Sequence, residues 1–350
     1  MKPIVIFIIF MFSIPSLVFA NDVCETHKAR SYEPGENTPA ICLHEPNTIG
    51  LTWDGDDNER FMDFKLSVKY QLIPEYSTNW LNKVKNHLGD NSAIYFAFSG
   101  RFGQYISTRD SSPVVGKRFN PEIFIRFWED LKPGDVDHRE SNYLDVSLFN
   151  HESNGQSINS QAGFDAAFIQ ASANGFNGLD AYDQISRSWN MFELTYKDKK
   201  EELIESTIKN QFFTIDATGY YGLKYFIPSQ AEEFNRLGEV NPQGLQGWET
   251  DPEGKPRQQV DGVSLAYKGV IYLANREQKC EICPLKYYLG YTTGIRNPGH
   301  YKTWRTEFGF NFPYVDLPIT LYWQTGYNSD LAQYYKKVSS VGFFVDIGSF

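Results

Sequence analysis

The stretch Trp304-Arg305-Thr306-Glu307-Phe308-Gly309-Phe310-Asn311-Phe312 alternates apolar or aromatic residues with polar, charged or small ones. Successive side chains of a β-strand point to opposite faces, so this stretch predicts a strand with one apolar face and one polar face. The same alternation recurs along the chain, for example over residues 64–72 and 319–324. It indicates an all-β protein of twelve strands, which start near Asn47, Asp63, Ser92, Pro121, Tyr143, Ser186, Gln211, Gly262, Leu285, Thr303, Pro318 and Val338.

Two architectures produce such strands. A soluble sandwich buries the apolar face against a second sheet, whereas an outer-membrane barrel turns it to lipid and lines its lumen with polar groups. The polar face here is often charged, as a hydrated lumen allows, with Lys65, Lys69, Arg305 and Glu307 as examples. The chain also ends in a strand that closes on Phe350, similar to the assembly signal of bacterial outer-membrane proteins. We therefore predict a twelve-stranded antiparallel transmembrane β-barrel.

The composition excludes several other classes. The chain has 350 residues, of which 41% are hydrophobic, 22% charged and 16% aromatic, and its net charge is −10. The hydrophobic fraction is too low for a helical membrane protein, and the aromatic content argues against disorder. A negative chain lacks the cationic surface that nucleic-acid binding needs.

The N-terminus predicts export. Lys2 is followed by an apolar run over residues 4–12 and by the small-residue end Val18-Phe19-Ala20. This pattern is typical of a secretory signal peptide over residues 1–20, and the run is too short to span a membrane. We expect a periplasmic segment over 21–46 and the barrel over 47–350, with both termini on the periplasmic side. The longest connections, over 152–185 and 222–260, follow odd-numbered strands and would face outward.

The cysteines form two local pairs, Cys24 with Cys42 and Cys280 with Cys283. An even number in an exported chain favours disulfides, and the expected topology places both pairs in the periplasm. The spacing Cys280-Glu281-Ile282-Cys283 also fits a redox or metal motif, but no His or Cys cluster accompanies it. A disulfide across a turn is the preferred interpretation.

A candidate chemical site lies at the end of the fifth predicted strand, in Asn150-His151-Glu152-Ser153-Asn154-Gly155-Gln156. His151 and Ser153 are two residues apart, so they share a face of the strand. A histidine can act as the base that activates a serine, if a third group orients its ring. Asn190 on the next strand can be that group. By spacing alone, a surface histidine near a serine is more often without function. Residues 144, 146 and 148 alternate opposite to His151, which requires a bulge or an apolar patch in the lumen.

These residues resemble the signature segments of the outer-membrane phospholipase A of Gram-negative bacteria, in Asn150-His151-Glu152-Ser153-Asn154-Gly155 and Ser186-Arg187-Ser188-Trp189-Asn190. A third matching segment is Ser111-Ser112-Pro113, after the third strand. The family's members are twelve-stranded barrels with a serine–histidine–asparagine triad. The resemblance implies a phospholipase that cleaves acyl esters of glycerophospholipids, with Ser153 as nucleophile, His151 as base and Asn190 as the orienting residue.

The resemblance also implies calcium. The backbone N–H of Gly155 matches the family's oxyanion donor, which would act together with the ion. The matching calcium ligands are the Gln156 carbonyl, the Ser186 hydroxyl, Asp183, and Ser111 from a second subunit. Residues 157–182 are an insertion relative to the family's short loop, so Asp180 or Asp165 could replace Asp183.

The family's site is completed by a dimer, so we expect a calcium-promoted homodimer. The family's buried interface glutamine falls at Ser99 here, which predicts a weaker dimer. The rival interpretation is a catalytically inactive barrel, a porin or adhesin, in which the triad-like residues are relics.

Overall fold

The structure is a computed structural model. It describes residues 41–55, 59–72, 92–106, 115–129, 142–156, 158, 161–173, 181, 184, 186–205, 211–227, 257–275, 285–312, 317–327, 331 and 334–347. None of the helices in these ranges is long and apolar enough to cross a membrane.

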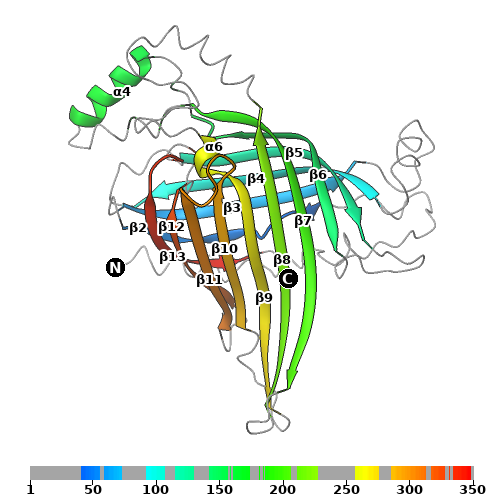
Figure 1. The fold of residues 1–350 in the computed structure, drawn as a ribbon. Coiled ribbons are helices and arrows are strands. Elements are labelled where there is room, and N and C mark those ends of the chain that lie inside the picture. The colour runs from blue at the N-terminus through cyan, green and yellow to red at the C-terminus, as the bar shows by residue number, and fades with distance from the viewer. Residues whose placement is uncertain are drawn as a thin grey trace, which may run out of the picture.

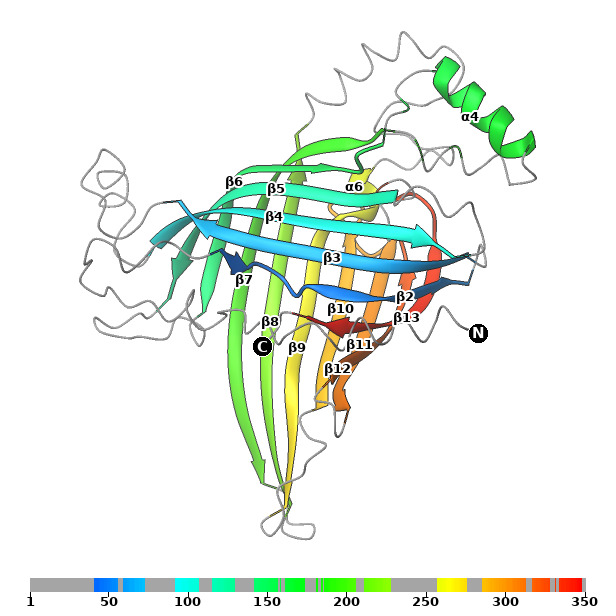
Figure 2. The same ribbon diagram turned by 180° about the vertical axis from the view of Figure 1, so that it is seen from behind.

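Twelve antiparallel strands of the described chain form a closed barrel (Figures 1 and 2), which confirms the predicted architecture and strand order. Each strand pairs with its neighbours in sequence, and the last pairs with the first to close the ring. A short additional strand, β1, precedes β2 in the chain and pairs with the part of β3 that lies past the start of β2. The strands are β1 (Cys42–Leu43), β2 (Thr48–Asp54), β3 (Glu59–Gln71), β4 (Ser92–Tyr105), β5 (Val115–Trp128), β6 (Tyr143–Ser153), β7 (Ser188–Glu205), β8 (Gln211–Phe226), β9 (Gly262–Asn275), β10 (Leu285–Gly294), β11 (Lys302–Phe312), β12 (Leu317–Gly326) and β13 (Val338–Asp346).

The alternation of the sequence separates the two faces of the barrel wall. The outer face carries exposed apolar side chains, among them Leu66, Leu265, Leu289, Phe308 and Leu321. The inner face carries charged residues joined in pairs across neighbouring strands or along one strand. These pairs are Arg101 with Asp63 at 2.6 Å, Arg126 with Asp145 at 2.7 Å and Arg305 with Glu307 at 2.5 Å. Pairing compensates these charges for their removal from bulk water.

Three neighbouring strands, β7 to β9, are longer than most of the others. They have 18, 16 and 14 residues, and both views show them extending past the rest of the wall at one end. The opposite end is the one at which β6 stops and β7 starts. We call it the site end, because the candidate residues lie there.

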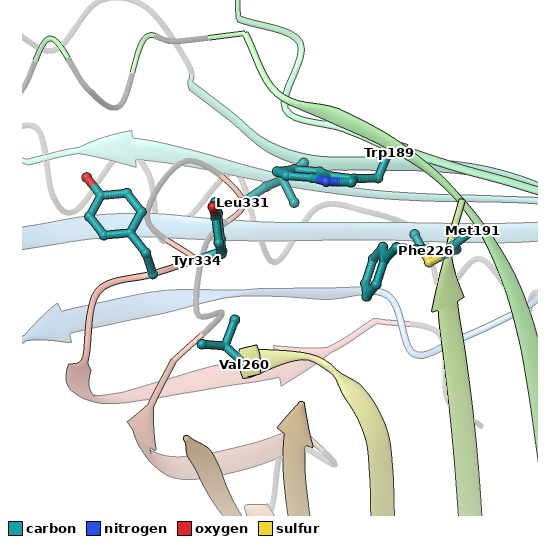
Figure 3. Close-up of a cluster of buried hydrophobic side chains, with 7 residues drawn as sticks. Trp189, Met191, Phe226, Val260, Leu331 and Tyr334 are labelled. Carbon is teal, nitrogen blue, oxygen red and sulfur yellow. The ribbon is translucent and has the colours of Figure 1, made fainter. Parts of the chain in front are cut away.

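An apolar cluster packs against the inner side of the wall at the site end (Figure 3). It joins the start of β7, the end of β8 and the connections around β9 and β13, through Trp189, Met191, Phe226, Val260, Leu331, Tyr334 and Tyr335. The short helix α6 (Arg257–Val260) brings Val260 into this cluster directly before β9. The start of β7 is therefore packed on its inner side.

Both long connections begin later in the chain than the sequence predicts. β6 continues through Ser153 and β8 through Phe226, so the expected boundaries at 152 and 222 are wrong by a few residues. The strands extend because the wall still offers backbone partners there, with Ser153 opposite Ser188 and Phe226 opposite Met191. The first connection also contains a helix, α4 (Gln161–Ala173), which stands clear of the barrel at the site end.

Candidate active site

A β-bulge in β6 places His151 and Ser153 on the outer wall. The pairing of β6 with β7 shifts by one residue between Val146 and His151, and the pairing with β5 shifts at the same point. Leu148 is the additional residue, and both it and Phe149 are exposed. A bulge places two residues opposite one, so the alternation reverses beyond it. This explains why residues 144 to 148 alternate opposite to His151, and of the two explanations that the sequence leaves open it confirms the bulge.

His151 lies directly opposite Asn190 on β7. The His151 Nδ1 and Asn190 Oδ1 atoms are 2.6 Å apart, a hydrogen bond in which the ring nitrogen donates to the amide oxygen. The ring of Phe149 lies nearly parallel to the imidazole, with centroids 6.4 Å apart. Because Nδ1 is engaged in the hydrogen bond to Asn190, Nε2 is the ring nitrogen that can accept a proton.

Ser153 follows on the same face, two residues along β6. Both Ser153 and His151 are described and partly exposed, and the structure records no hydrogen bond between their side chains. Contacts between a nucleophile and its base are often long before substrate binds. The structure thus joins His151 to Asn190 and places Ser153 beside them.

The turn after Ser153 is held by Asn154, which is fully buried. Its Oδ1 accepts hydrogen bonds from the amides of Arg187 at 2.9 Å and Gln156 at 3.3 Å, and its own amide donates to the Arg187 carbonyl at 3.0 Å. Gly155 between them has φ of 63°, and a Cβ there would lie 2.7 Å from the Phe119 ring. Within the described chain no hydrogen bond is recorded for the Gly155 amide, which leaves it available as an oxyanion donor.

The segments that contain Gln156 and Ser186, two of the expected calcium ligands, lie side by side. The Ser186 amide donates to the Ile158 carbonyl at 2.8 Å, and the Ile158 amide donates to the Gln184 carbonyl at 3.2 Å. These bonds hold the two ends of the insertion together, so the long connection leaves Gln156 and Ser186 on neighbouring segments. Asp165 lies on an exposed part of α4. Ser111, Asp180 and Asp183 lie outside the described residues.

No group of three or more His, Cys, Asp or Glu residues that could hold a metal occurs in the described chain. Of the four cysteines, Cys42 is described and is disulfide-bonded. The other three, Cys24, Cys280 and Cys283, lie outside the described residues, so the predicted pairing stays a prediction.

The expected role of Ser99 is wrong. Its hydroxyl lies 2.7 Å from that of Ser67, which is fully buried, and the two residues are cross-strand partners on the lumen side of the wall. Ser99 has the parity of the buried Ala97, so it faces inward. It therefore cannot contact a second barrel through the outer wall, and the argument for a weak dimer from this position fails.

Sequence reasoning missed a buried ionic cluster directly behind the site. Glu152, between His151 and Ser153, points inward and contacts Arg118 at 2.9 Å and Arg257 from α6. Arg257 also lies 3.0 Å from Asp261. Burial raises the pKa of Asp261, but the positive charges of Lys224, Arg257 and Arg118 outweigh it and hold that pKa at about 2. One signal was available in the sequence. If His151 and Ser153 face outward, Glu152 between them must face inward, and a buried carboxylate needs a positively charged partner.

Known proteins resemble this chain in both fold and sequence. The structure of outer membrane phospholipase A from Escherichia coli matches over 93% of this chain and 98% of its own, with a TM-score of 0.51 and 13% identity. The calcium-bound dimer of the Salmonella typhi outer membrane phospholipase matches over 89% and 95%, with a TM-score of 0.50 and 16% identity. The barrel has the fold of outer membrane phospholipase A.

The sequence comparison agrees over a shorter stretch. Phospholipase A1 of Proteus vulgaris is 26% identical over 138 residues, which are 37% of this chain and 45% of that protein. The match therefore spans less than half of the relative. No family model matches the chain. Together the similarities bear out the resemblance that the triad segments predict.

Proposed function

We propose that this protein is a calcium-dependent phospholipase of the bacterial outer membrane. It hydrolyses acyl esters of glycerophospholipids, with A1, A2 and lysophospholipase activity. The observation that carries the proposal is the 2.6 Å contact between His151 Nδ1 and Asn190 Oδ1, beside Ser153, on the outer wall of a closed barrel. A nucleophile on this wall meets a lipid ester directly, without extracting the lipid from its surroundings.

In the reaction, the Ser153 hydroxyl attacks the ester carbonyl carbon while His151 Nε2 takes its proton. The carbon–oxygen ester bond breaks, and the protonated His151 gives that proton to the departing lysophospholipid alcohol. Water then attacks the acyl-serine ester, again losing a proton to His151, which passes it to the Ser153 oxygen as the fatty acid leaves. Asn190 keeps the imidazole in the tautomer and orientation that both steps need.

Negative charge develops on the carbonyl oxygen in both steps. The Gly155 amide can donate to it, because the Asn154 turn engages the amides on either side. Calcium would be held by the Gln156 carbonyl, the Ser186 hydroxyl, Asp183 and Ser111 of the partner subunit. The bound ion would add a positive charge beside the developing oxyanion. The adjacent segments at Gln156 and Ser186 support this ligand set.

The same proposal gives the orientation. The exposed apolar side chains of the outer wall face lipid and the charged lumen faces water. The site end, with the longest connections, faces outward, after export by the signal peptide over residues 1–20. The predicted disulfides, Cys24–Cys42 and Cys280–Cys283, lie in the periplasm. Each closes a short loop and stabilises by about 2–3 kcal/mol. Peptide mapping without reduction checks this, and free thiols or crossed pairs would contradict it.

The test is hydrolysis of phospholipid in mixed micelles by full-length mature protein refolded in detergent, with calcium or with a chelator. Folding is monitored by heat-modifiable migration on a denaturing gel. We expect hydrolysis only with calcium, and none from Ser153→Ala. Ser188→Ala is the matched control, because it removes the hydroxyl opposite Ser153 and should leave activity unchanged. A folded wild type that hydrolyses nothing would instead favour a passive porin-like barrel or adhesin.

A further inference from the structure

The residue between the proposed base and nucleophile is held from inside the barrel. Glu152 is 2% exposed, and its carboxylate contacts the guanidinium groups of Arg118 and Arg257. Its neighbours His151 and Ser153 point outward, since successive residues of a strand alternate. The backbone that carries both of them is therefore anchored from inside the barrel through the Glu152 side chain.

Arg257 also contacts β7, the strand that carries Asn190. It is 1% exposed, and its guanidinium lies over the rings of Trp189, at 4.6 Å, and Phe226, at 4.7 Å. Trp189 directly precedes Asn190 and is the cross-strand partner of Glu152. One side chain thus contacts the inner faces of β6, β7 and β8 at the level of the site.

The helix that carries Arg257 is itself fixed in place. The second carboxylate partner, Asp261, lies one helical turn away at 3.0 Å and also accepts the Gly262 amide at 2.9 Å. Val260 between them is fully buried in the apolar cluster of Figure 3. A guanidinium keeps its charge at any pH at which the protein folds. Arg257 is therefore a permanently charged residue that connects α6 and the apolar cluster to β6 and β7.

We propose that Arg257 is a positioning residue for catalysis, which sets the spacing of β6 and β7 and so keeps His151 against Asn190. The inference rests on the proposed function. It assigns a role in catalysis to Arg257, which lies in the second long connection. Arg257 reaches the site only from behind the wall and touches none of the reacting groups. Its loss should disturb the geometry of the triad and leave lipid binding to the outer wall intact.

The chain offers a matched control for the general cost of removing a buried arginine. Arg126 is 5% exposed, pairs with Asp145 at 2.7 Å, and lies over the Tyr143 ring at 3.6 Å. Asp145 is on β6, as Glu152 is, but on the far side of the bulge at Leu148. Arg126→Met should therefore destabilise the barrel while leaving the site undisturbed.

The experiment compares kcat and KM per folded molecule for wild type, Arg257→Met, Arg257→Lys and Arg126→Met. We expect Arg257→Met to lower kcat by about 100-fold with KM nearly unchanged, the loss typical of an ångström-scale misplacement. Arg257→Lys should recover part of kcat, because it keeps the charge but not the planar group. Arg126→Met should keep the wild-type kcat. A folded Arg257→Met with wild-type kcat would overturn the proposal, as would equal losses in the two arginine variants.

A second measurement keeps this result separate from the proposed function. The rate at which an alkyl sulfonyl fluoride sulfonylates the Ser153 hydroxyl, with release of fluoride, reports the activated serine without lipid turnover, and it should fall in parallel with kcat. If folded wild type neither hydrolyses lipid nor reacts, the proposed function fails. If wild type reacts and the Arg257 variants react equally fast, only the positioning role fails. Should Arg257→Met not fold, Arg257→Lys and Glu152→Gln carry the test, and wild-type labelling rates in both would refute it.

Discussion

Replacing Asn190 by alanine should weaken catalysis without abolishing it. The substitution removes one hydrogen bond, the 2.6 Å contact with His151 Nδ1 on the outer wall. A hydrogen bond between neutral groups contributes about 1 kcal/mol, and one to a charged group about 1.5–3 kcal/mol. In the proposed mechanism His151 is neutral before the reaction and carries a proton in the transition state, so the contact strengthens by about 0.5–2 kcal/mol as the reaction proceeds.

That difference is the part that affects the rate. At 1.36 kcal/mol per factor of ten, it corresponds to a fall in kcat of about 2- to 30-fold. KM should stay near the wild-type value, because Asn190 binds the base and not the lipid. His151→Ala provides the reference for complete loss, since it removes the base itself.

The assay is steady-state hydrolysis of a phospholipid in mixed micelles at saturating calcium. Asn142→Ala is the matched control: Asn142 accepts a hydrogen bond from the Lys199 amide at 2.8 Å, at the other end of the same pair of strands. It should leave kcat unchanged. The reasoning fails if Asn190→Ala keeps the wild-type kcat, or if it is as inactive as His151→Ala.

Three further predictions follow from the same region. Gly155→Ala should lower both kcat and the free energy of unfolding, the latter by about 1–2 kcal/mol for the positive φ alone. Combining it with Phe119→Leu should relieve only the clash between the new Cβ and the Phe119 ring. Steady-state kinetics and urea unfolding test this. Ser186→Ala should raise the calcium concentration for half-maximal activity with kcat retained at saturation, and an unchanged calcium titration would contradict its role. The pKa of Asp261 is lower in the folded protein than in the unfolded chain, so the ionised carboxylate stabilises the fold above pH about 4. About 2 kcal/mol of this stability is lost as the pH falls to about 2. Asp261→Asn should therefore flatten the pH dependence of the free energy of unfolding in that window.

The strands could be predicted because period-two alternation is a local signal. The side chains that face lipid or lumen are set by parity, and the opposite parities of Val146 and His151 limited the explanation to a bulge or an apolar patch in the lumen. The same rule would have corrected Ser99. It shares parity with Ala97 and Arg101, both of which face the lumen side of the wall. The resemblance to the family therefore places its interface position on the wrong face of the wall here, because the side chain of Ser99 faces Ser67 inside the barrel.

The two helices show where local patterns stop being sufficient. Helix α4 lies in a segment rich in small residues, yet Phe164 and Phe168 are spaced by one helical turn, and Phe164 packs with Ile158 and Ala181. That spacing was a usable signal. Arg257 had none, because its partner Glu152 is far away in sequence, and only the closed barrel brings the two together.

The segment from Asn150 to Ser153 uses both faces of one strand, and this explains why the site is built on a strand and not on a loop. The outward residues, His151 and Ser153, carry the proposed chemistry, whereas the inward ones are buried and engaged, Asn150 with Glu193 at 2.8 Å and Glu152 with its arginines. A loop could present the same two groups to a lipid, but nothing would fix their backbone from behind. Because the bulge at Leu148 decides which face each residue takes, a regular strand of the same sequence would bury His151 and expose Glu152. The bulge is thus the feature on which both the outward site and its inward support depend.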